Sequence, residues 1–337
     1  MSRSEVTIDL GAVRRNVLRL RSVLGATELW AVVKADGYGH GAADVARAAT
    51  DAGATALCVA TVAEGLSLRR VLRGQRIVVL GPTREVPEAR EGRLELVVAR
   101  GELPSDVPVH VKLDTGMGRY GFAELPPLSA NVVGLMTHLA TADSDPSFAE
   151  RQLGRFRELA AGADGLTLHA ANSAAALRLP GSRLDAARCG IAVYGLSPFG
   201  TDPAEDGLEP VLGWRSELAQ VKELEPGAST GYGRRFVAGR PTWIGIVPVG
   251  YADGFRRDLT GTEVLVAGQR CRVVGTVSMD SFAVELPEPL PPGTGVTLIG
   301  DGLLTEEHAR HAGTITYELA TGIRTGPERA ARTVLDA

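Results

Sequence analysis

One segment near the start of the chain decides the fold, and it reads Ala31-Val32-Val33-Lys34-Ala35-Asp36-Gly37-Tyr38-Gly39-His40-Gly41. The apolar run that ends at Val33 is typical of a buried strand, and a lysine follows it directly. A loop with three glycines comes next, and an alanine-rich helix is expected over residues 42–52. A lysine at the lip of a parallel sheet is partly desolvated, which favours the neutral amine that forms Schiff bases. Lys34 is therefore a candidate nucleophile; the alternative is an ordinary surface lysine.

Strand-like and helix-like segments alternate from about residue 28 to residue 193, which predicts βαβ units and a parallel sheet. Eight strands over that span favour a closed (β/α)₈ barrel, in which chemistry sits at the carboxyl ends of the strands. The expected strands are Leu29–Lys34, Ala56–Ala60, Ile77–Leu80, Leu94–Ala99, Val109–Asp114, Val132–His138, Thr167–Ala171 and Asp185–Ile191. Helices are expected over Ala42–Ala52, Val62–Leu72 and Phe148–Ala161.

The alternation of strand-like and helix-like segments stops at Ser197–Pro210, a segment rich in Pro, Gly and acidic residues that is typical of a linker. Beyond it come short strands punctuated by Gly and Pro, and only Glu306–Ala312 and Tyr317–Thr321 have a helical pattern. We therefore expect an α/β fold, with a TIM-like barrel over residues 1–209 and a mostly β C-terminal domain over residues 210–337. The expected strands of this domain are Leu218–Leu224, Thr242–Val249, Glu263–Val266, Cys271–Val274, Phe282–Leu286 and Val296–Ile299.

Composition excludes several classes of function. The chain has 337 residues, 44% of them hydrophobic, and its 36 basic residues are scattered while its net charge is −4. A nucleic-acid-binding surface needs clustered basic residues, so no nucleic-acid partner is expected. The sequence has no apolar signal core and no run of membrane-spanning length, so we expect a cytoplasmic protein without a membrane partner. Three distant cysteines indicate neither a disulfide framework nor a metal site.

The segment around Lys34 resembles the pyridoxal-phosphate lysine signature of the alanine racemase family. The resemblance extends from the segment that starts at Thr7 to Arg329, and the family's other motifs follow in order along nearly the whole chain. They are Val111-Lys112-Leu113-Asp114-Thr115-Gly116-Met117-Gly118-Arg119-Tyr120-Gly121, His138-Leu139-Ala140-Thr141-Ala142-Asp143, His169-Ala170-Ala171-Asn172-Ser173, Arg188-Cys189-Gly190-Ile191, Gly231-Tyr232-Gly233, Gly250-Tyr251-Ala252-Asp253-Gly254 and Met279-Asp280.

The resemblance implies a racemase that uses pyridoxal 5'-phosphate and two bases. Lys34 would hold the cofactor and act as a base on one face of the substrate Cα. The opposite face needs a second base, because a single base tends to return the same enantiomer. In the family this base is a tyrosine from the other subunit of a homodimer, here Tyr232. Its high ordinary pKa requires neighbours that favour phenolate, and the family's pair His138 and Arg188 has that role.

The resemblance also assigns the binding residues. Arg188 contacts the pyridine nitrogen in the family and cannot give up its proton, which weakens the electron sink and favours simple proton exchange. Ser173 opens an expected helix, Ser173–Arg178, whose N-terminus suits an anion, although a serine there is more commonly an N-cap. The matching cofactor ligands are Tyr38, His169, Ser173, Arg188, Gly190, Ile191 and Tyr317, and the substrate-binding residues are Arg119, Met279 and Tyr251.

Two segments depart from the family pattern. The segment before Met279-Asp280 lacks the usual arginine and cysteine, and the segment ending at Arg329 lacks the first arginine of the usual ending. By the resemblance, both segments line or support the entrance through which the substrate reaches the active site, and neither contains a proton-transfer residue. We therefore expect an alanine racemase that acts on a small amino acid and supplies D-alanine for cell-wall peptide. The alternatives are a racemase of serine or a basic amino acid and a non-enzymatic carrier of the cofactor. Carriers need no second domain, and the glycine-rich phosphate loop of fold-related decarboxylases is missing.

Overall fold

The computed structural model describes residues 3–336 and divides into two compact units. The barrel unit consists of residues 12–199 and 203–209, and the sheet unit consists of the residues up to 11, 200–202 and 210 onward. No helix within residues 3–336 is long and apolar enough to cross a bilayer.

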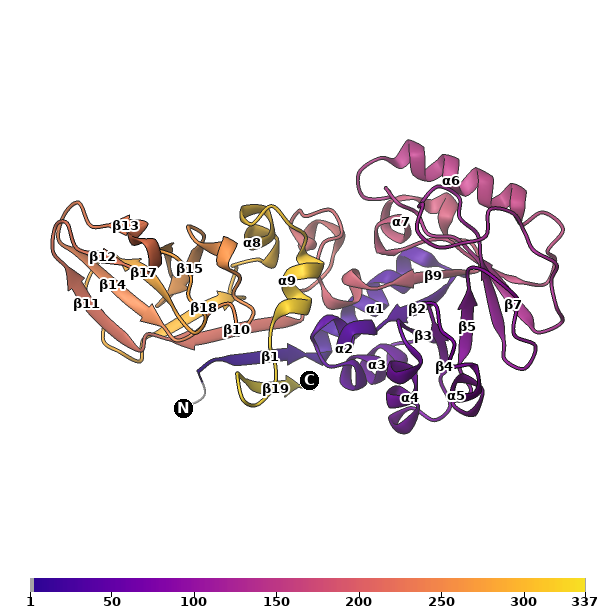
Figure 1. The fold of residues 1–337 in the computed structure, drawn as a ribbon, viewed down its shortest axis with the longest axis horizontal. Helices are drawn as coiled ribbons and strands as arrows, with labels where there is room; N and C mark the ends of the chain where they lie inside the picture. Colours follow the sequence, from indigo (N-terminus) through magenta and orange to yellow (C-terminus); the bar gives the residue numbers. More distant parts are fainter. Residues whose placement is uncertain (1–2, 337) are drawn as a thin grey trace. The chain divides into compact units, whose positions relative to one another are not determined.

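The barrel unit is a closed barrel of eight parallel strands (Figure 1), which confirms the predicted fold class. The barrel closes because the first strand pairs with both the second and the last: Ala31 lies opposite Leu57 on one side and Cys189 on the other. Each observed strand lies within one or two residues of its predicted segment. The strands are β2 (Glu28–Val32), β3 (Ala56–Val59), β4 (Arg76–Val79), β5 (Glu95–Val98), β6 (Val109–Lys112), β7 (Val132–Met136), β8 (Thr167–His169) and β9 (Ala186–Cys189).

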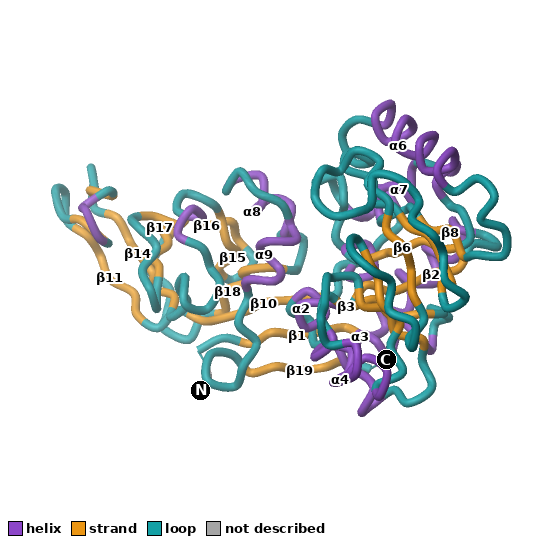
Figure 2. Tube along the Cα trace, turned by 45° about the vertical axis from the view of Figure 1, so that its right-hand side comes forward, coloured by secondary structure: helices purple, strands orange, loops and turns teal. Residues whose placement is uncertain are grey.

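Helices follow most of the strands and surround the barrel (Figure 2). Their starts have clear local causes: the Thr61 side chain accepts from the Glu64 N–H in a capping box, and Asp145 caps a helix that begins with a proline. The helices of this unit are α1 (Leu10–Leu24, its first two residues in the sheet unit), α2 (Lys34–Tyr38), α3 (Ala42–Asp51), α4 (Val62–Val71), α5 (Val86–Glu91), α6 (Pro146–Leu159) and α7 (Ser173–Arg178).

The sheet unit contains a nine-stranded, mostly antiparallel sheet, and this confirms the mostly β character of the C-terminal domain. The strand order is β11-β14-β17-β16-β15-β18-β10-β1-β19. The elements are β1 (Glu5–Asp9), β10 (Leu212–Glu217), β11 (Gln220–Leu224), β12 (Ser229–Thr230), β13 (Phe236–Val237), β14 (Thr242–Val247), β15 (Glu263–Val266), β16 (Gln269–Val274), β17 (Phe282–Leu286), β18 (Gly295–Ile299), α8 (Thr305–His311), α9 (Thr316–Gly322) and β19 (Ala331–Leu335).

The N-terminal residues differ from the expected division at residue 209. We expected them in the barrel domain, but β1 pairs with β10 on one side and with β19 on the other. Val6 and Ile8 alternate with polar residues and are completely buried, so this strand contributes one face to the core of the sheet unit. Short apolar alternation of this kind does not by itself reveal which distant strands it pairs with.

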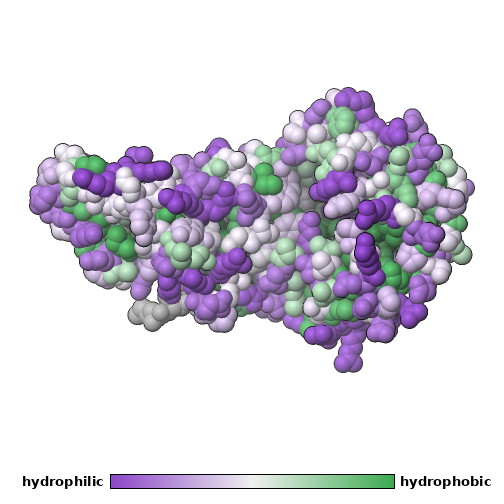
Figure 3. All heavy atoms as spheres, in the orientation of Figure 1, coloured by the Kyte–Doolittle hydropathy of each residue, from purple (hydrophilic) through white to green (hydrophobic). Residues whose placement is uncertain are grey.

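Figure 3 shows that hydrophilic and hydrophobic side chains are intermixed over the visible face of each unit. Apolar strand residues such as Leu57, Ile77 and Leu96 are at most 1% exposed. In the barrel unit, however, a set of polar side chains also lies inside: His110, His169 and Arg188 are all at most 3% exposed. Buried polar groups of this kind need partners, and they mark the region where chemistry is concentrated.

Candidate active site

Lys34 follows β2 and begins a turn of unusual backbone conformation. Ala35, Asp36 and Tyr38 have positive φ values of 52°, 50° and 53°, a region that non-glycine residues adopt at a cost. Side chains hold this turn in place: the Glu64 carboxylate accepts from the Ala35 N–H at 2.8 Å, and the Asp36 carboxylate accepts from the Ala42 N–H at 2.8 Å. The glycine-rich loop predicted after Lys34 is therefore a tight left-handed turn that fixes the lysine at the barrel rim.

The electrostatic environment of Lys34 favours its neutral amine. Burial lowers the pKa of the Lys34 ammonium, the charge of Arg119 lowers it further, and Glu64 and Cys58 oppose the shift. The desolvation expected from the sequence is therefore present, and the residue is half-buried rather than a freely solvated surface lysine.

A group of buried donors and hydroxyls lies beside β9. The N–H of Gly190 donates to the Ser173 hydroxyl at 3.0 Å, and a Cβ placed on Gly190 would lie only 2.4 Å from the Tyr38 hydroxyl oxygen. Within residues 3–336 the completely buried N–H of Ile191 has no acceptor. The N-cap of α7 is Asn172, whose side chain accepts from the Ala175 N–H, so the alternative role of Ser173 as a helix cap does not apply. The Ser173 hydroxyl instead accepts from the loop after β9.

These groups fit the phosphate of pyridoxal phosphate. A phosphate accepts hydrogen bonds, and a buried N–H without an acceptor next to two hydroxyls supplies donors without adding a charge. Gly190 has no side chain, which lets the backbone and Tyr38 approach each other closely. Tyr38, Ser173, Gly190 and Ile191 would hold this group.

Arg188 is buried at the same end of the barrel among neutral acceptors. It donates to Nδ1 of His169 at 2.9 Å, to the carbonyls of Thr137 and His169 at 2.8 and 2.9 Å, and to Nδ1 of His138 at 3.3 Å. Burial lowers the pKa of Arg188 to about 10, which still leaves it protonated near neutral pH. Burial and then the charge of Arg188 lower the pKa of both His138 and His169 well below the ordinary histidine value. Both imidazoles are therefore neutral.

The loop after β6 brings two more cations to this rim. The Asp114 carboxylate accepts from the N–H groups of Gly116, Met117 and Gly118 at 2.9 to 3.1 Å and thereby shapes the loop that carries Arg119. Burial lowers the pKa of Lys112 to about 8, and Arg119 and Arg188 add to the shift. Arg119 is exposed on the wall of a cavity of about 710 Å³. A cationic rim of this kind suits an anionic substrate such as an amino-acid carboxylate.

The remaining candidates lie in the sheet unit. Tyr232, Met279 and Tyr251 are 72%, 52% and 42% exposed. Their loops are connected, because the Tyr251 N–H donates to the Ser278 carbonyl at 3.1 Å and the Thr276 hydroxyl donates to the Tyr232 carbonyl at 2.9 Å. Tyr317 is half-buried on α9, the helix whose Glu318 pairs with Arg256.

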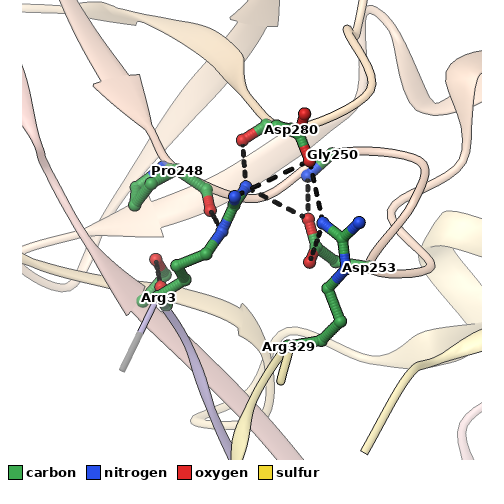
Figure 4. Close-up of polar contacts among 7 residues, drawn as sticks. Arg3, Pro248, Gly250, Asp253, Asp280 and Arg329 are labelled. Atoms are coloured by element: carbon green, nitrogen blue, oxygen red, sulfur yellow. Dashed lines mark hydrogen bonds and ion pairs between the residues drawn. The ribbon is translucent and has the colours of Figure 1, made fainter. Parts of the chain in front are cut away.

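An ion-pair cluster anchors two of these loops (Figure 4). The buried Asp253 carboxylate accepts from the Gly250 N–H at 2.8 Å and lies 3.5 Å from Arg3 and 3.4 Å from Arg329. Arg329 also pairs with Asp280 at 2.8 Å, and Arg3 donates to the Pro248 carbonyl at 3.1 Å. The cluster therefore ties the Tyr251 loop to the Met279 loop.

The structure thus brings the barrel candidates together at one rim and gathers Tyr232, Tyr251 and Met279 on connected loops of the sheet unit. Sequence reasoning missed Asp253 as an anchor and His110 as a buried partner of His169, at 3.0 Å. A signal existed for His110, since a histidine inside the apolar run Val109–Val111 must be buried and paired.

Comparisons with known proteins agree over the whole chain. Residues 8–198 match the family model for the alanine racemase N-terminal domain, and residues 211–331 match that for the alanine racemase C-terminal domain. Alanine racemase of Lactiplantibacillus plantarum is 40% identical over 95% of both chains, and alanine racemase 1 of Bacillus subtilis is 40% identical over 94% of this chain and 90% of its own.

Solved structures lead to the same family. The crystal structure of alanine racemase from E. faecalis has a TM-score of 0.90 at 37% identity, and it covers 99% of this chain and 98% of its own. The biosynthetic alanine racemase of Pseudomonas aeruginosa has a TM-score of 0.91 at 35% identity, over 100% of both chains. With both domains matched in order, the chain belongs to the alanine racemase family.

Proposed function

We propose that this chain interconverts L-alanine and D-alanine, with pyridoxal 5'-phosphate as its cofactor. The observation that carries the proposal is the placement of a desolvated lysine, a cradle of phosphate donors and a buried arginine at one barrel rim, in a chain whose two domains both match alanine racemases. When bound, pyridoxal phosphate withdraws electrons from the Cα of the attached amino acid and makes its proton removable.

The barrel residues have distinct tasks in this proposal. Lys34 would hold the cofactor through its Nζ atom, and its neutral amine would exchange a proton on one face of the substrate Cα. Arg119 binds the substrate carboxylate. Arg188 is protonated and hydrogen-bonded to His169. It would face the pyridine nitrogen as a donor that does not give up its proton. That restraint favours return of the proton to Cα over side reactions.

The second base is Tyr232, supplied by a second copy of the chain in a homodimer with shared active sites. A side chain that is 72% exposed on a glycine-flanked turn is free to enter a neighbouring subunit. Met279 and Tyr251 would accompany it, because hydrogen bonds connect their loops. The product, D-alanine, would serve cell-wall peptide synthesis in the cytoplasm.

Substrate and cofactor are tested by chiral chromatography after incubation with a panel of L-amino acids. We expect alanine to be racemised fastest, and Lys34→Ala to abolish both turnover and covalent retention of the cofactor after borohydride reduction. Lys222→Ala, on the exposed part of β11, is the matched control and should behave as wild type. A reducible adduct in the Lys34 variant would refute the assignment, and equal turnover of a bulky amino acid would favour a racemase of broader scope.

The shared site is tested by mixing two inactive variants, Lys34→Ala and Tyr232→Phe. If each site combines Lys34 of one subunit with Tyr232 of the other, half of the sites in a mixed dimer contain neither lesion. We expect roughly a quarter of wild-type activity to return when equal amounts are unfolded and refolded together. No recovery in dimers shown to be mixed would place both bases in one chain.

A further inference from the structure

A row of polar side chains crosses the interior of the barrel, from the partly exposed Glu95 to the buried Arg188. Glu95 is the first residue of β5, His110 the second of β6, His169 the last of β8 and Arg188 the third of β9. The strands are parallel, so the row leads from the amino end of the barrel to its catalytic rim. The distances are 2.8 Å from Glu95 to His110 Nε2, 3.0 Å from His110 Nδ1 to His169 Nε2, and 2.9 Å from His169 Nδ1 to Arg188.

The chemistry of the two ends fixes every proton in between. The guanidinium of Arg188 can only donate, so Nδ1 of His169 accepts and its single proton lies on Nε2. That proton is donated to Nδ1 of His110, whose own proton therefore lies on Nε2 and is donated to the Glu95 carboxylate. All the hydrogen bonds run in one direction, from the guanidinium to the carboxylate.

The charges at both ends are consistent with this direction. Burial alone would raise the pKa of Glu95, but hydrogen bonds from His110 and Arg76 lower it below the ordinary value, so Glu95 is ionised. Burial lowers the pKa of His110, which keeps this imidazole neutral although Glu95 opposes the shift. Apart from burial, only the charges of Cys58 and Cys189 shift the pKa of Arg188, and no carboxylate contributes to that shift. Hydrogen bonds through His169 and His110 connect Arg188 to the carboxylate of Glu95.

The surrounding residues keep the two imidazoles in this arrangement. Trp30 is completely buried, and its ring lies 4.5 Å from that of His169 and 5.5 Å from that of His110 between centroids. Gly134 on β7 leaves room for the contact, because a Cβ there would lie 2.4 Å from Nδ1 of His110. With apolar walls on their faces, the imidazoles have few other partners, so the donor at Arg188 and the acceptor at Glu95 together decide which tautomer is present.

We propose that Glu95 is a positioning residue for the racemase reaction, which fixes the tautomers of His110 and His169 and thereby orients Arg188 toward the cofactor. This inference rests on the proposed function for its effect on turnover, whereas the tautomers themselves do not depend on it. Without an acceptor at position 95, the proton of His110 loses its partner at Nε2. A shift of that proton to Nδ1 would require His169 to present an N–H to Arg188, a contact between two donors.

The first measurement is the ¹⁵N NMR spectrum of the histidine side chains in cofactor-free protein labelled at its six histidines. In wild type we expect His110 and His169 to be neutral, each with its proton on Nε2. Glu95→Leu should introduce the second tautomer at both residues. Glu95→Gln retains an acceptor oxygen and should restore the wild-type pattern. Glu28→Gln is the control, since Glu28 lies at the same end of the barrel, 3.8 Å from Arg76, and glutamine retains an oxygen that can accept from the indole N–H of Trp30.

The second measurement is steady-state kinetics with saturating cofactor. Glu95→Leu should lower kcat about tenfold, the scale expected when a supporting hydrogen bond to a site residue is lost. KM for alanine should stay within about twofold, because Arg188 does not bind the substrate carboxylate. Glu95→Gln and Glu28→Gln should retain wild-type kcat.

Three results would overturn the proposal: a proton on Nδ1 of His169 in wild type, unchanged tautomers in Glu95→Leu, or altered tautomers with unchanged kcat. If Glu95→Leu does not fold, the wild-type spectrum together with Glu95→Gln still decides the direction of the row. A wild-type protein that racemises no amino acid would refute the proposed function, and the imidazole spectra would still decide the arrangement of the row.

Discussion

Replacement of Asp253 by asparagine is expected to destabilise the sheet unit through the ion-pair cluster of Figure 4. The Asp253 side chain is 2% exposed, and its oxygens face Arg3 at 3.5 Å and Arg329 at 3.4 Å. Asparagine retains an acceptor for the Gly250 N–H but removes the charge that both guanidiniums approach. Breaking a fully buried pair costs about 3–5 kcal/mol, whereas an exposed pair contributes at most about 1 kcal/mol.

The geometry of the cluster sets the expected magnitude between these limits. One partner is buried, but the side chains of Arg3 and Arg329 are 36% and 30% exposed and can turn toward water. We therefore expect a loss of about 2 kcal/mol, which corresponds to a fall in Tm of roughly 5 °C for a unit of this size. Differential scanning calorimetry of the cofactor-free protein measures this shift directly.

A second aspartate provides the control. Asp301 pairs with Arg215 at 2.8 Å, but these side chains are 48% and 62% exposed. Asp301→Asn should therefore lower Tm by less than about 2 °C. Equal shifts for the two variants, or a smaller shift for Asp253→Asn, would show that burial does not set the strength of this cluster.

Two further predictions concern the barrel rim. Gly190→Ala places a methyl group 2.4 Å from the Tyr38 hydroxyl and should weaken cofactor binding at least about tenfold in a fluorescence titration. Gly181→Ala is the control, because its Cβ would meet nothing closer than 3.8 Å, and it should bind the cofactor as wild type does. Burial lowers the pKa of Lys112 from 10.5 to about 8. Between these pH values the folded state therefore binds fewer protons than the unfolded state. The contribution of Lys112 to the free energy of unfolding consequently rises with pH across this range. In urea unfolding, the free energy of unfolding of wild type should rise by about 3 kcal/mol relative to that of Lys112→Met between pH 7 and pH 10.5. Parallel pH profiles for the two proteins would contradict this account.

The barrel was predictable from the sequence because its strands are continuous apolar runs with local boundaries. The run that ends at Val33 is buried on both faces, as parallel strands are. The helix-like segment that follows it buries one face, which consists of Val45, Ala46, Ala48 and Ala49. The motif around Lys34 also has a local cause, since the glycines at 37, 39 and 41 all have positive φ.

The parts that could not be predicted depend on contacts between distant residues. Nothing in the five residues of β1 specifies that they pair with Leu212 and with Ala331. From the sequence, Asp253 is an ordinary turn aspartate, and only the fold brings Arg3 and Arg329, which are distant in sequence, into contact with it. Glu95 similarly reads as the polar first residue of a strand, and only the closure of the barrel places it against His110.

The position of β1 between β10 and β19 has a consequence for how the chain is made. During synthesis β1 emerges before the barrel strands, whereas β19, which pairs with one of its edges, begins only at Ala331. The barrel strands, which need only their sequence neighbours and the pairing of β2 with β9, can assemble in the meantime. While the barrel strands are being made, the nascent chain thus carries an unpaired, half-apolar strand, a segment prone to association with other chains. Chaperone binding during synthesis should concentrate on Glu5–Asp9, and release should coincide with completion of the C-terminal strand.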